Sequence, residues 1–416
     1  MRWRWSWSRE VTVARWPVRR RGTFSRSCSA SRSRRSAPRM CRGDSVNKTL
    51  GQRILDKVNV PLVLCVLALL VYGSIVVASA TSEMAGGAGL LRRHILGAVV
   101  GLVPLALAWA FDYTRLRGWH GVLVTMGVLL LISPRLPGIG YEAGGATSWI
   151  QLFGVRLFQP SEPAKLIFIV VTAAVIASFK GRIDSPRAVS VVGAYVAGAV
   201  GLILLQPDLG TGLVFVAIAF VMLIVGGMKG RYFAIAAGLL VVATFVVLQF
   251  GLLADYQEDR LLVFVDPSRD PAGAGYNLAQ SKIAIGSGGL TGKGLGSGTQ
   301  SNLHFIPARH TDFIFSVLGE ELGFIGAVTL LGLYLALLLT ALAIATSSRD
   351  LFGALIAAGV LGMWLFQILE NVGMTVGMMP ITGIPLPFMS FGSSAMVTNL
   401  GAVGLLLSVW SRRYGA

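Results

Sequence analysis

Three stretches of this sequence hold most of the residues that could do chemistry, and each lies between long apolar segments. The longest, residues 275–326, contains Asp312 directly before an apolar run. A carboxylate at the boundary between water and lipid is partly desolvated, which raises its pKa and makes it a better general base. The position also suits a helix N-cap, because unpaired N–H groups attract an acidic side chain. The residues alone favour the cap.

The same stretch is rich in glycine: seven of the 13 residues from Gly286 to Gly298 are Gly. Such backbone can approach a phosphate closely and offer it several N–H groups. It can equally serve as a flexible hinge. It is not a Walker A loop, because Gly294 follows Lys293 where Ser or Thr is required. Both interpretations stay open.

Acidic residues also lie within or beside the apolar segments. Glu320 and Glu321 follow Asp312 by about two helical turns. Carboxylates inside a bilayer are expensive and usually functional, although either could instead accept a hydrogen bond from a neighbouring helix. Asp208, in the sequence QPDLGTG, interrupts a pair of apolar segments. There an Asp that forms a turn is the structural alternative.

The other two stretches carry an aromatic residue, a charge pair and a run of prolines. Trp149 is typical of an interfacial anchor, and its functional alternative is stacking on a sugar. Glu162 and Lys165, in QPSEPAK, are three residues apart and can pair on one helix face. Pro385 is the central proline of PITGIPLPF, which cannot be helical. Such backbone near membrane depth is tolerated where it is buried or lines a cavity, which favours a groove wall.

Helices in lipid must position these residues. Hydrophobic residues make up 54% of the chain and charged residues only 13%, whereas about a quarter of a soluble domain is charged. Ten segments approach the roughly 20 apolar residues that a spanning helix needs. They are residues 60–80, 94–111, 119–133, 164–180, 188–205, 211–228, 232–250, 313–345, 352–370 and 393–411. We therefore expect an all-α integral membrane protein with about ten transmembrane helices.

Basic residues in the short loops set the predicted orientation. They follow every second span, at Arg115, Arg117, Lys180, Arg182, Arg187, Lys229, Arg231, Arg349, Arg412 and Arg413. The positive-inside rule then makes these loops and both termini cytoplasmic, with Arg92 and Arg93 as the main exception. Residues 134–163, the large loop 251–312 between spans seven and eight, and residues 371–392 face the outside. Function is expected there, because the large loop is too long for a connector.

The N-terminal segment is the most basic part of the chain. Residues 1–50 hold 14 of the 36 Lys and Arg residues and two of the 19 acidic residues, so they carry +12 of the net charge of +17. Basic residues mixed with Trp can bind nucleic acid or anionic lipid, but no apolar core accompanies them. We expect residues 1–45 to be a disordered tail, with Met40 or Val46 as the true start. Residues 46–416 should form a single membrane domain, without a nucleic-acid partner.

Several long motifs resemble those of the SEDS family, the shape, elongation, division and sporulation polymerases. They occur in order between about residues 55 and 411: GA..W with QPSEPAK, QPDLGTG, GYNLAQSKIAIGSGGLTGKG, HTDFIFSVLGEELGFIG and NVGMTVGMMPITGIPLPFMSFGSS. Within the family the sequence is similar to the RodA elongation branch, which also has Arg309 directly before His310 and the run from Gly298 to Ser301. It departs from the pattern at Ala308, Phe391 and Ser393. Ala308 casts doubt on a salt bridge at its position.

The resemblance implies a peptidoglycan glycosyltransferase of the bacterial inner membrane that polymerises lipid II outside the cytoplasm during elongation. It makes Asp312 the catalytic general base instead of a cap. Charge that develops on the diphosphate leaving group calls for cations, and a divalent ion such as Mg²⁺ or Mn²⁺ is compatible with this, although no cofactor is certain. The implied substrate-binding residues are Trp149, Glu162, Lys165, Arg260, Lys282, Lys293, Arg309 and His310, and the implied cavity or structural residues are Asp208, Glu320, Glu321 and Pro385.

The resemblance also implies partners, a class B penicillin-binding protein transpeptidase and other membrane proteins of the elongation complex. Two other functional classes compete with the enzyme. A lipid II flippase should have charged residues through the full membrane depth and some repeat symmetry, and the sequence has no convincing internal repeat. A scaffold that only recruits the transpeptidase would not require Asp312.

Overall fold

The computed structural model describes residues 57–84, 86–136, 138, 140–143, 146–152, 155–179, 183–249, 263–264, 266, 270, 273–303, 305–306 and 308–414. All of them belong to one compact unit, Thr49–Ala416. The predicted tail, residues 1–45, lies outside the described residues, and so does the predicted phosphate ligand Arg260.

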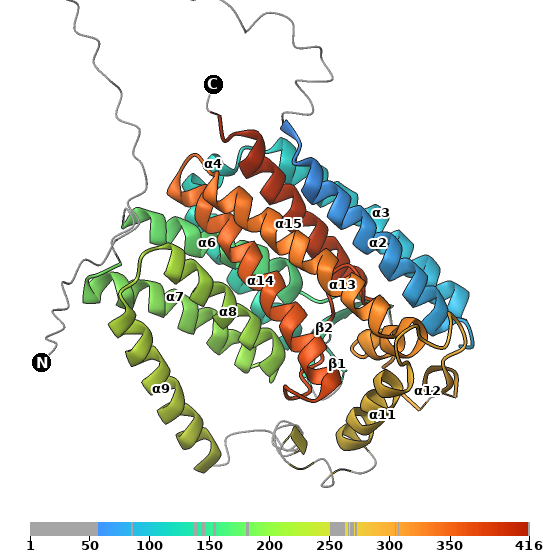
Figure 1. Ribbon diagram of the computed structural model, residues 1–416. Helices are drawn as coiled ribbons and strands as arrows, with labels where there is room; N and C mark the ends of the chain where they lie inside the picture. The colour runs from blue at the N-terminus through green and yellow to red at the C-terminus, as the bar shows by residue number, and fades with distance from the viewer. Residues whose placement is uncertain are drawn as a thin grey trace, which may run out of the picture. The chain divides into compact units, whose positions relative to one another are not determined.

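Helices occupy all ten predicted spans (Figure 1). They are α2 (Val60–Thr81), α3 (Gly87–Ala110), α4 (Tyr113–Leu116) continued by η1 (Arg117–Trp119) and α5 (His120–Ile132), α6 (Ser161–Ser178), α7 (Pro186–Leu204), α8 (Leu209–Val225), α9 (Gly230–Gln249), α13 (Ile314–Thr346), α14 (Leu351–Val376) and α15 (Ser393–Ser411). Within the described part of the chain, eight helical segments are long and apolar enough to cross a membrane, and α8 is a shorter apolar helix of 17 residues. The chain is a multi-pass membrane protein. The number of spans and their orientation stay predictions.

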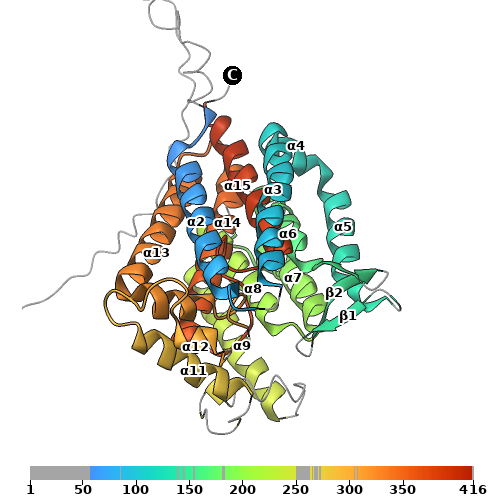
Figure 2. The same cartoon turned by 90° about the vertical axis from the view of Figure 1, so that its right-hand side faces the viewer.

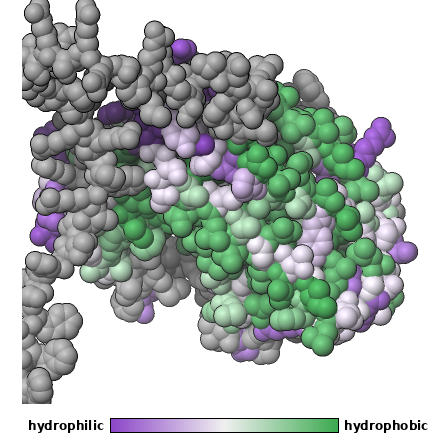
Figure 3. All heavy atoms as spheres, turned by 45° about the horizontal axis from the view of Figure 1, so that its top comes forward, coloured by the Kyte–Doolittle hydropathy of each residue, from purple (hydrophilic) through white to green (hydrophobic). Residues whose placement is uncertain are grey.

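Apolar side chains cover much of the outer surface of the helices. Leu64, Leu107, Val122 and Leu129 are each at least 60% exposed, and apolar residues dominate the described surface that Figure 3 presents. A soluble monomer rarely exposes an apolar patch of more than a few hundred Å². The exposed faces of α2, α3 and α5 are therefore lipid-facing surfaces.

The core is built around α14, which contacts α6, α8, α13 and α15. In the most apolar windows of α6, α14 and α15, 78% of the residues are buried, against 11–17% in α3, α7 and the segment from α4 to α5. At the centre, the indole Nε1 of Trp364 donates to Asn399 Oδ1 at 2.8 Å. Polar groups in lipid must be satisfied within the protein, and this bond joins α14 to α15.

The structure is mostly helical, as expected of an all-α membrane protein, but a three-stranded antiparallel sheet that was not predicted lies in the first predicted external loop. After η2 (Ser133–Arg135), strands β1 (Gly140–Ala143), β2 (Ala146–Leu152) and β3 (Val155–Phe158) pair in chain order, with Tyr141 opposite Trp149. The signal was present in the sequence. Gly144 and Gly145 separate two short runs of β-type residues, which is a typical hairpin pattern.

In the described part of the loop between α9 and α13 lie the helices α11 (Ala274–Ser287) and α12 (Thr299–Asn302). The Oγ atoms of Ser281 and Ser316 are 2.6 Å apart, and Ser281 Oγ also donates to the carbonyl of Thr375 at 2.6 Å. Ser281 is fully buried, so α11 is fixed to both α13 and α14. In Figures 1 and 2, α11, α12 and the sheet lie at the end of the helix bundle opposite α4. We call this end the site end.

Helix α13 is broken near its start, which the prediction of one continuous span missed. Gly323 has φ 63° and ψ −160°, so the helix does not continue through it. The glycine-rich segment fills the break. The amides of Lys293 and Gly294 donate to the carbonyls of Glu320 and Glu321, and the amides of Phe324 and Ile325 donate to the carbonyls of Gly289 and Leu290. These four bonds replace helical bonds that the break removes.

Candidate functional site

Asp312 lies at the site end, in the turn that leads into α13. Helix α13 begins at Ile314 and its N-cap is Phe313, so Asp312 lies one residue before the N-cap position. The cap interpretation of Asp312 is therefore wrong. Asp312 is partly exposed, whereas Arg309 before it and Phe313 after it are buried.

Asn371 ties the Asp312 turn to the proline-rich segment. Its Nδ2 donates to the carbonyl of Asp312 at 2.9 Å and to the carbonyl of Ile384 at 2.8 Å. Asn371 is fully buried on α14. One amide group thus fixes the backbone on both sides of the carboxylate.

The Asp312 side chain lies against Gly383. A β-carbon on Gly383 would lie 3.3 Å from Asp312 Oδ2, and Gly383 has a left-handed φ of 74°. The preceding residue, Thr382, donates its hydroxyl to Glu370 Oε1 at 2.6 Å. Glu370 is buried, with 2% of its surface exposed. A second carboxylate therefore holds the residue next to the glycine that meets Asp312.

A further set of contacts joins this segment to the starts of α8 and α6. A β-carbon on Gly210 would lie 2.9 Å from the carbonyl oxygen of Thr382. Asp208 caps α8 by accepting from Thr211 N at 3.0 Å, and its Oδ2 accepts from Gln159 Nε2 at 3.4 Å. The structural interpretation of Asp208, a turn-forming acid, is confirmed.

Glu162 and Lys165 form the predicted pair in the first turn of α6. Lys165 Nζ lies 2.8 Å from Glu162 Oε1, and both side chains are about 95% buried or more. A buried pair of this kind is costly to desolvate and is destabilising to break. The backbone amide of Gln159, two residues before the helix, donates to Ser394 Oγ at 3.2 Å. The pair therefore lies beside the starts of α15 and α8.

Arg309 and His310 precede Asp312 and pack inwards. Arg309 is 1% exposed; burial lowers the pKa of its guanidinium, and the charges of Glu321 and Glu83 oppose that shift. Burial, together with the charge of Arg309, lowers the pKa of His310. The His310 ring is 5.5 Å from the ring of Phe391, and its carbonyl accepts from Phe391 N at 2.9 Å. Both residues shape the turn around Asp312.

Lys282 is the exposed predicted cation at the site end. A β-carbon on Gly377 would lie 2.5 Å from Lys282 Nζ. Gly377 is the C-cap of α14, where the helix dipole favours a positive charge. α14 extends six residues beyond its predicted end at 370, which brings its C-terminus to Lys282. This ammonium group can reach a ligand without leaving a buried ion pair.

Lys293 and Glu320 pair with each other: Nζ lies 2.8 Å from Oε1. Glu320 Oε1 also accepts from Thr299 Oγ1 at 3.1 Å and from the amide of Gln300 at 2.9 Å. Glu321 accepts a short bond from Ser79 Oγ on α2, which confirms the interpretation that one of these acids bonds a neighbouring helix. The amides of Lys293 and Gly294 are used inside the α13 break, so they cannot cradle a phosphate in this conformation.

The remaining predicted residues line the edges of this end. Trp149 lies in β2, opposite Tyr141. Pro385 is partly exposed in the segment after α14, which forms no helix, as its prolines predict. Its neighbours Ile384 and Leu386 are buried. The predicted groove wall therefore has one face packed on the core.

Sequence analysis missed two buried polar residues, Glu370 and Asn371. The predicted span ended at Glu370, so Asn371 was assigned to a loop, whereas both residues lie within α14. An acid followed by an amide inside an apolar span was the available signal, because such groups are expensive in lipid. Within the described residues, no three His, Cys, Asp or Glu side chains come together as a metal site. The side chains around Asp312 thus do not form a ready metal site.

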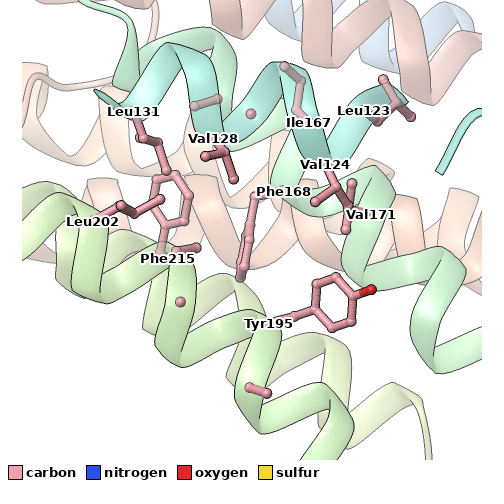
Figure 4. A pocket seen from close by; sticks show the side chains of 15 residues that line it. Leu123, Val124, Val128, Leu131, Ile167, Phe168, Val171, Tyr195, Leu202 and Phe215 are labelled. Atoms are coloured by element: carbon pink, nitrogen blue, oxygen red, sulfur yellow. The ribbon is translucent and has the colours of Figure 1, made fainter. Parts of the chain in front are cut away.

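An apolar pocket of about 360 Å³ lies between α5, α6, α7 and α8 (Figure 4). One of its lining residues, Ala164, lies between Glu162 and Lys165 in the first turn of α6. It is open where Val128 and Gly198 are exposed. Its full lining is Leu123, Val124, Gly127, Val128, Leu131, Ala164, Ile167, Phe168, Val171, Ala194, Tyr195, Gly198, Ala199, Leu202 and Phe215. An apolar chain is the ligand that this lining suits.

Known proteins resemble the chain over most of its length. It is 37% identical over 363 residues to "Peptidoglycan glycosyltransferase MrdB" of Escherichia coli K12, covering 86% of this chain and 95% of that protein. It is 38% identical over 355 residues to "Stage V sporulation protein E" of Bacillus subtilis 168, covering 84% and 95%.

Two solved structures also resemble the chain over most of its length. The rod shape determining protein RodA of Thermus thermophilus has a TM-score of 0.63 at 32% identity, covering 85% of this chain and 97% of that one. A chain from "Structural coordination of polymerization and crosslinking by a peptidoglycan synthase complex" has a TM-score of 0.72 at 34% identity, covering 85% and 98%. The family described as "Cell cycle protein", which groups FtsW, RodA and SpoVE, matches residues 59–414. The chain therefore belongs to the FtsW/RodA/SpoVE family, the SEDS proteins.

Proposed function

We propose that the chain is a peptidoglycan glycosyltransferase that polymerises lipid II during cell elongation. One observation carries the proposal. A partly exposed carboxylate, Asp312, has its backbone held by Asn371 and its side chain against Gly383 at the site end. The names of the relatives, MrdB among them, support the same activity. The site end then faces the outside of the bacterial inner membrane, where the lipid-linked disaccharide is displayed.

In the proposed reaction, Asp312 acts as the general base. Its carboxylate takes the proton of the GlcNAc 4-hydroxyl of one lipid II molecule. That oxygen forms a bond to C1 of the MurNAc of the second molecule while the bond from C1 to the diphosphate breaks. The anomeric carbon inverts, and undecaprenyl diphosphate leaves with the bonding electron pair. Positioned bases contribute about 10²–10⁴-fold to such steps.

The leaving diphosphate needs positive charge near it. Lys282 fits this role best, because it is exposed at the site end. Lys293 would first have to leave Glu320, and Arg309 is buried against Glu321 and Glu83. Arg260 lies outside the described residues and stays a candidate from sequence. Among the described residues, no three His, Cys, Asp or Glu side chains converge, so the proposed reaction assigns the neutralising charge to cationic side chains.

The lipid chain of the substrate needs an apolar surface beside the site. The pocket lined by α5, α6, α7 and α8 offers one, because its lining residue Ala164 lies in the same turn of α6 as the buried pair of Glu162 and Lys165. A chain there would lie along α6 while the diphosphate stays near the helix starts. In this arrangement Glu162 and Lys165 brace the wall between head group and tail, and Trp149 on β2 is available to stack on a sugar.

A transpeptidase of the class B penicillin-binding proteins is the proposed partner. One structural neighbour comes from work on "polymerization and crosslinking by a peptidoglycan synthase complex", which supports this pairing. Other membrane proteins of the elongation complex would join the same assembly.

The test uses the full chain purified with its partner transpeptidase, whose own nucleophile is inactivated. Fluorescent lipid II is supplied, and glycan products are separated by gel for wild type and Asp312→Asn. Wild type should give ladders and Asp312→Asn should give none. Ladders from the variant would refute Asp312 as the base. An absence of ladders from wild type, together with transbilayer movement of lipid II in vesicles, would favour a flippase.

A further inference from the structure

Glu370 is a buried acid in a helix that crosses the membrane, and the proposed reaction does not use it. Only 2% of its surface is exposed, and it lies one helical residue before Asn371 on α14. Ionisable groups in such segments are expensive and tend to be retained for function. Its environment therefore needs an explanation.

Its contact is specific. Glu370 Oε1 accepts the hydroxyl proton of Thr382 at 2.6 Å. Thr382 belongs to the segment after α14, in which residues 380–386 form no helix or strand. Backbone of this kind has no ladder of its own, so side chains from neighbouring elements must fix it. Glu370 fixes Thr382 from α14, and Gly210 of α8 packs against the carbonyl of the same residue.

The residue after Thr382 meets the proposed base. Gly383 adopts φ 74°, and the Oδ2 atom of Asp312 lies 3.3 Å from where its β-carbon would be. A shift of Thr382 would therefore move the surface on which the carboxylate rests. Asn371 holds the backbone of Asp312 and Ile384, whereas Glu370 holds the side chain of Thr382. The two neighbours on α14 thus have different tasks.

We propose that Glu370 is a positioning residue: its hydrogen bond to Thr382 fixes Gly383 against Asp312 and so sets the orientation of the carboxylate. The expected effect of Glu370 on the polymerisation rate rests on the proposed function. Its expected effect on the orientation of Asp312 rests on the geometry alone. It needs the acceptor oxygen and not the charge. Glu370→Gln should therefore retain it, and Glu370→Leu should abolish it. Thr382→Val removes the donor from the other side, and Thr382→Ser keeps it.

The first measurement is the polymerisation of lipid II by the full chain with its inactivated partner. A misplacement of about 1 Å can cost about 10²-fold in rate, so Glu370→Leu and Thr382→Val should lower kcat by about 10- to 100-fold with KM nearly unchanged. Glu370→Gln and Thr382→Ser should stay within about threefold of wild type. The double variant Glu370→Leu/Thr382→Val should be no worse than the worse single one, because both break one bond.

The second measurement does not depend on activity. Asp312→Cys is introduced after Cys28, Cys41 and Cys65 are replaced by Ala, and the rate of labelling by a small thiol reagent is followed. Thr382→Val should change that rate several-fold. Thr375→Val is the control: it makes the same Thr→Val change at a buried position of α14, the helix that carries Glu370, where the hydroxyl donates within the helix to Val372 O. It should leave both kcat and the labelling rate unchanged.

The outcomes separate the positioning role of Glu370 from the proposed function. Unchanged kcat and unchanged labelling in Thr382→Val would overturn the positioning role, and so would a Glu370→Gln variant as impaired as Glu370→Leu. Changed labelling with no polymerisation by any protein would support the positioning role and refute the proposed function. If Glu370→Leu fails to fold, Thr382→Val decides, because it alters no residue of a helix.

Discussion

Gly323 is a position where one added methyl group should strongly destabilise this fold. Its φ of 63° and ψ of −160° belong to a region that only glycine adopts readily. A β-carbon there would lie 2.3 Å from the amide nitrogen of Gly292 and 2.8 Å from the carbonyl carbon of Leu290. Both atoms are backbone, so neither can turn away as a flexible side chain would. We predict that Gly323→Ala destabilises the protein or expels the glycine-rich segment.

The magnitude follows from two terms. A non-glycine residue in such a conformation costs about 1–3 kcal/mol, and overpacking a filled site costs about 1–3 kcal/mol more. The free energy of unfolding should therefore fall by about 2–6 kcal/mol. Straightening α13 would relieve this clash, but it would break the four backbone hydrogen bonds that cross the break. Unsatisfied backbone groups in lipid cost several kcal/mol each.

The assay is reversible unfolding of the purified protein by added SDS, followed by tryptophan fluorescence. Gly332→Ala is the control, because Gly332 lies in the same helix, is exposed, and has no atom within 4 Å of an added β-carbon. It should match wild type or gain up to about 1 kcal/mol from the better helix propensity of Ala. A Gly323→Ala variant within about 0.5 kcal/mol of wild type would refute the reasoning, since both terms should exceed that value.

Three other predictions test the pair of Glu162 and Lys165, the half-buried His310 and the pocket. Lys165→Met leaves Glu162 buried without its partner, so the free energy of unfolding should fall by about 3–5 kcal/mol in the same SDS titration. Burial lowers the pKa of His310, so below about pH 6.5 the unfolded chain binds a proton that the folded chain excludes. Stability should therefore decline as the pH falls from about 6.5 toward the folded pKa, and His310→Gln should flatten that decline. Gly198→Leu fills the pocket of Figure 4 and should raise KM for lipid II by about three- to tenfold, a modest effect because lipid solvates a displaced chain as well as the pocket does.

Each of the three has a control. Glu162→Gln combined with Lys165→Met removes both charges and should recover part of the lost stability, and a double variant as unstable as the single one would contradict the charge argument. An unchanged pH slope in His310→Gln would mean that another group titrates. Gly193→Leu adds the same side chain on α7 outside the pocket, in open space. An equal rise in KM from Gly193→Leu would show that the effect of Gly198→Leu does not come from filling the pocket.

The helices were predictable because length and apolarity decide them. All ten predicted spans are occupied by helices. The errors lie where a polar residue interrupts the apolar pattern. The predicted span stopped at 370, where Glu370 and Asn371 interrupt the apolar run. The helix α14 continues past them to its C-cap, Gly377. The sheet was missed because its strands have only four to seven residues and lie in a loop that composition marks merely as irregular.

The candidate site was only partly predictable. The pair of Glu162 and Lys165 follows from local spacing, and the structure confirms it. The surroundings of Asp312 do not follow from spacing, because they come from residues about 60 to 70 positions away, such as Asn371 and Gly383. Composition suggested a phosphate nest or a hinge for the glycine-rich segment. The segment instead completes α13, which no periodicity could reveal.

Glycines at the crossing points explain how the separate motifs form one structure. Gly210 of QPDLGTG meets Thr382 of PITGIPLP, and Gly383 of that second motif meets Asp312 of HTDFIF. Gly292 of the glycine-rich motif meets Gly323 of GEELGFIG in the same way. At Gly210, Gly292 and Gly323 an added β-carbon would come closer than 3.0 Å to backbone of the other motif. A larger residue in one motif therefore requires a backbone shift in its partner, so the motifs specify one another across the fold and the position of Asp312 depends on all of them.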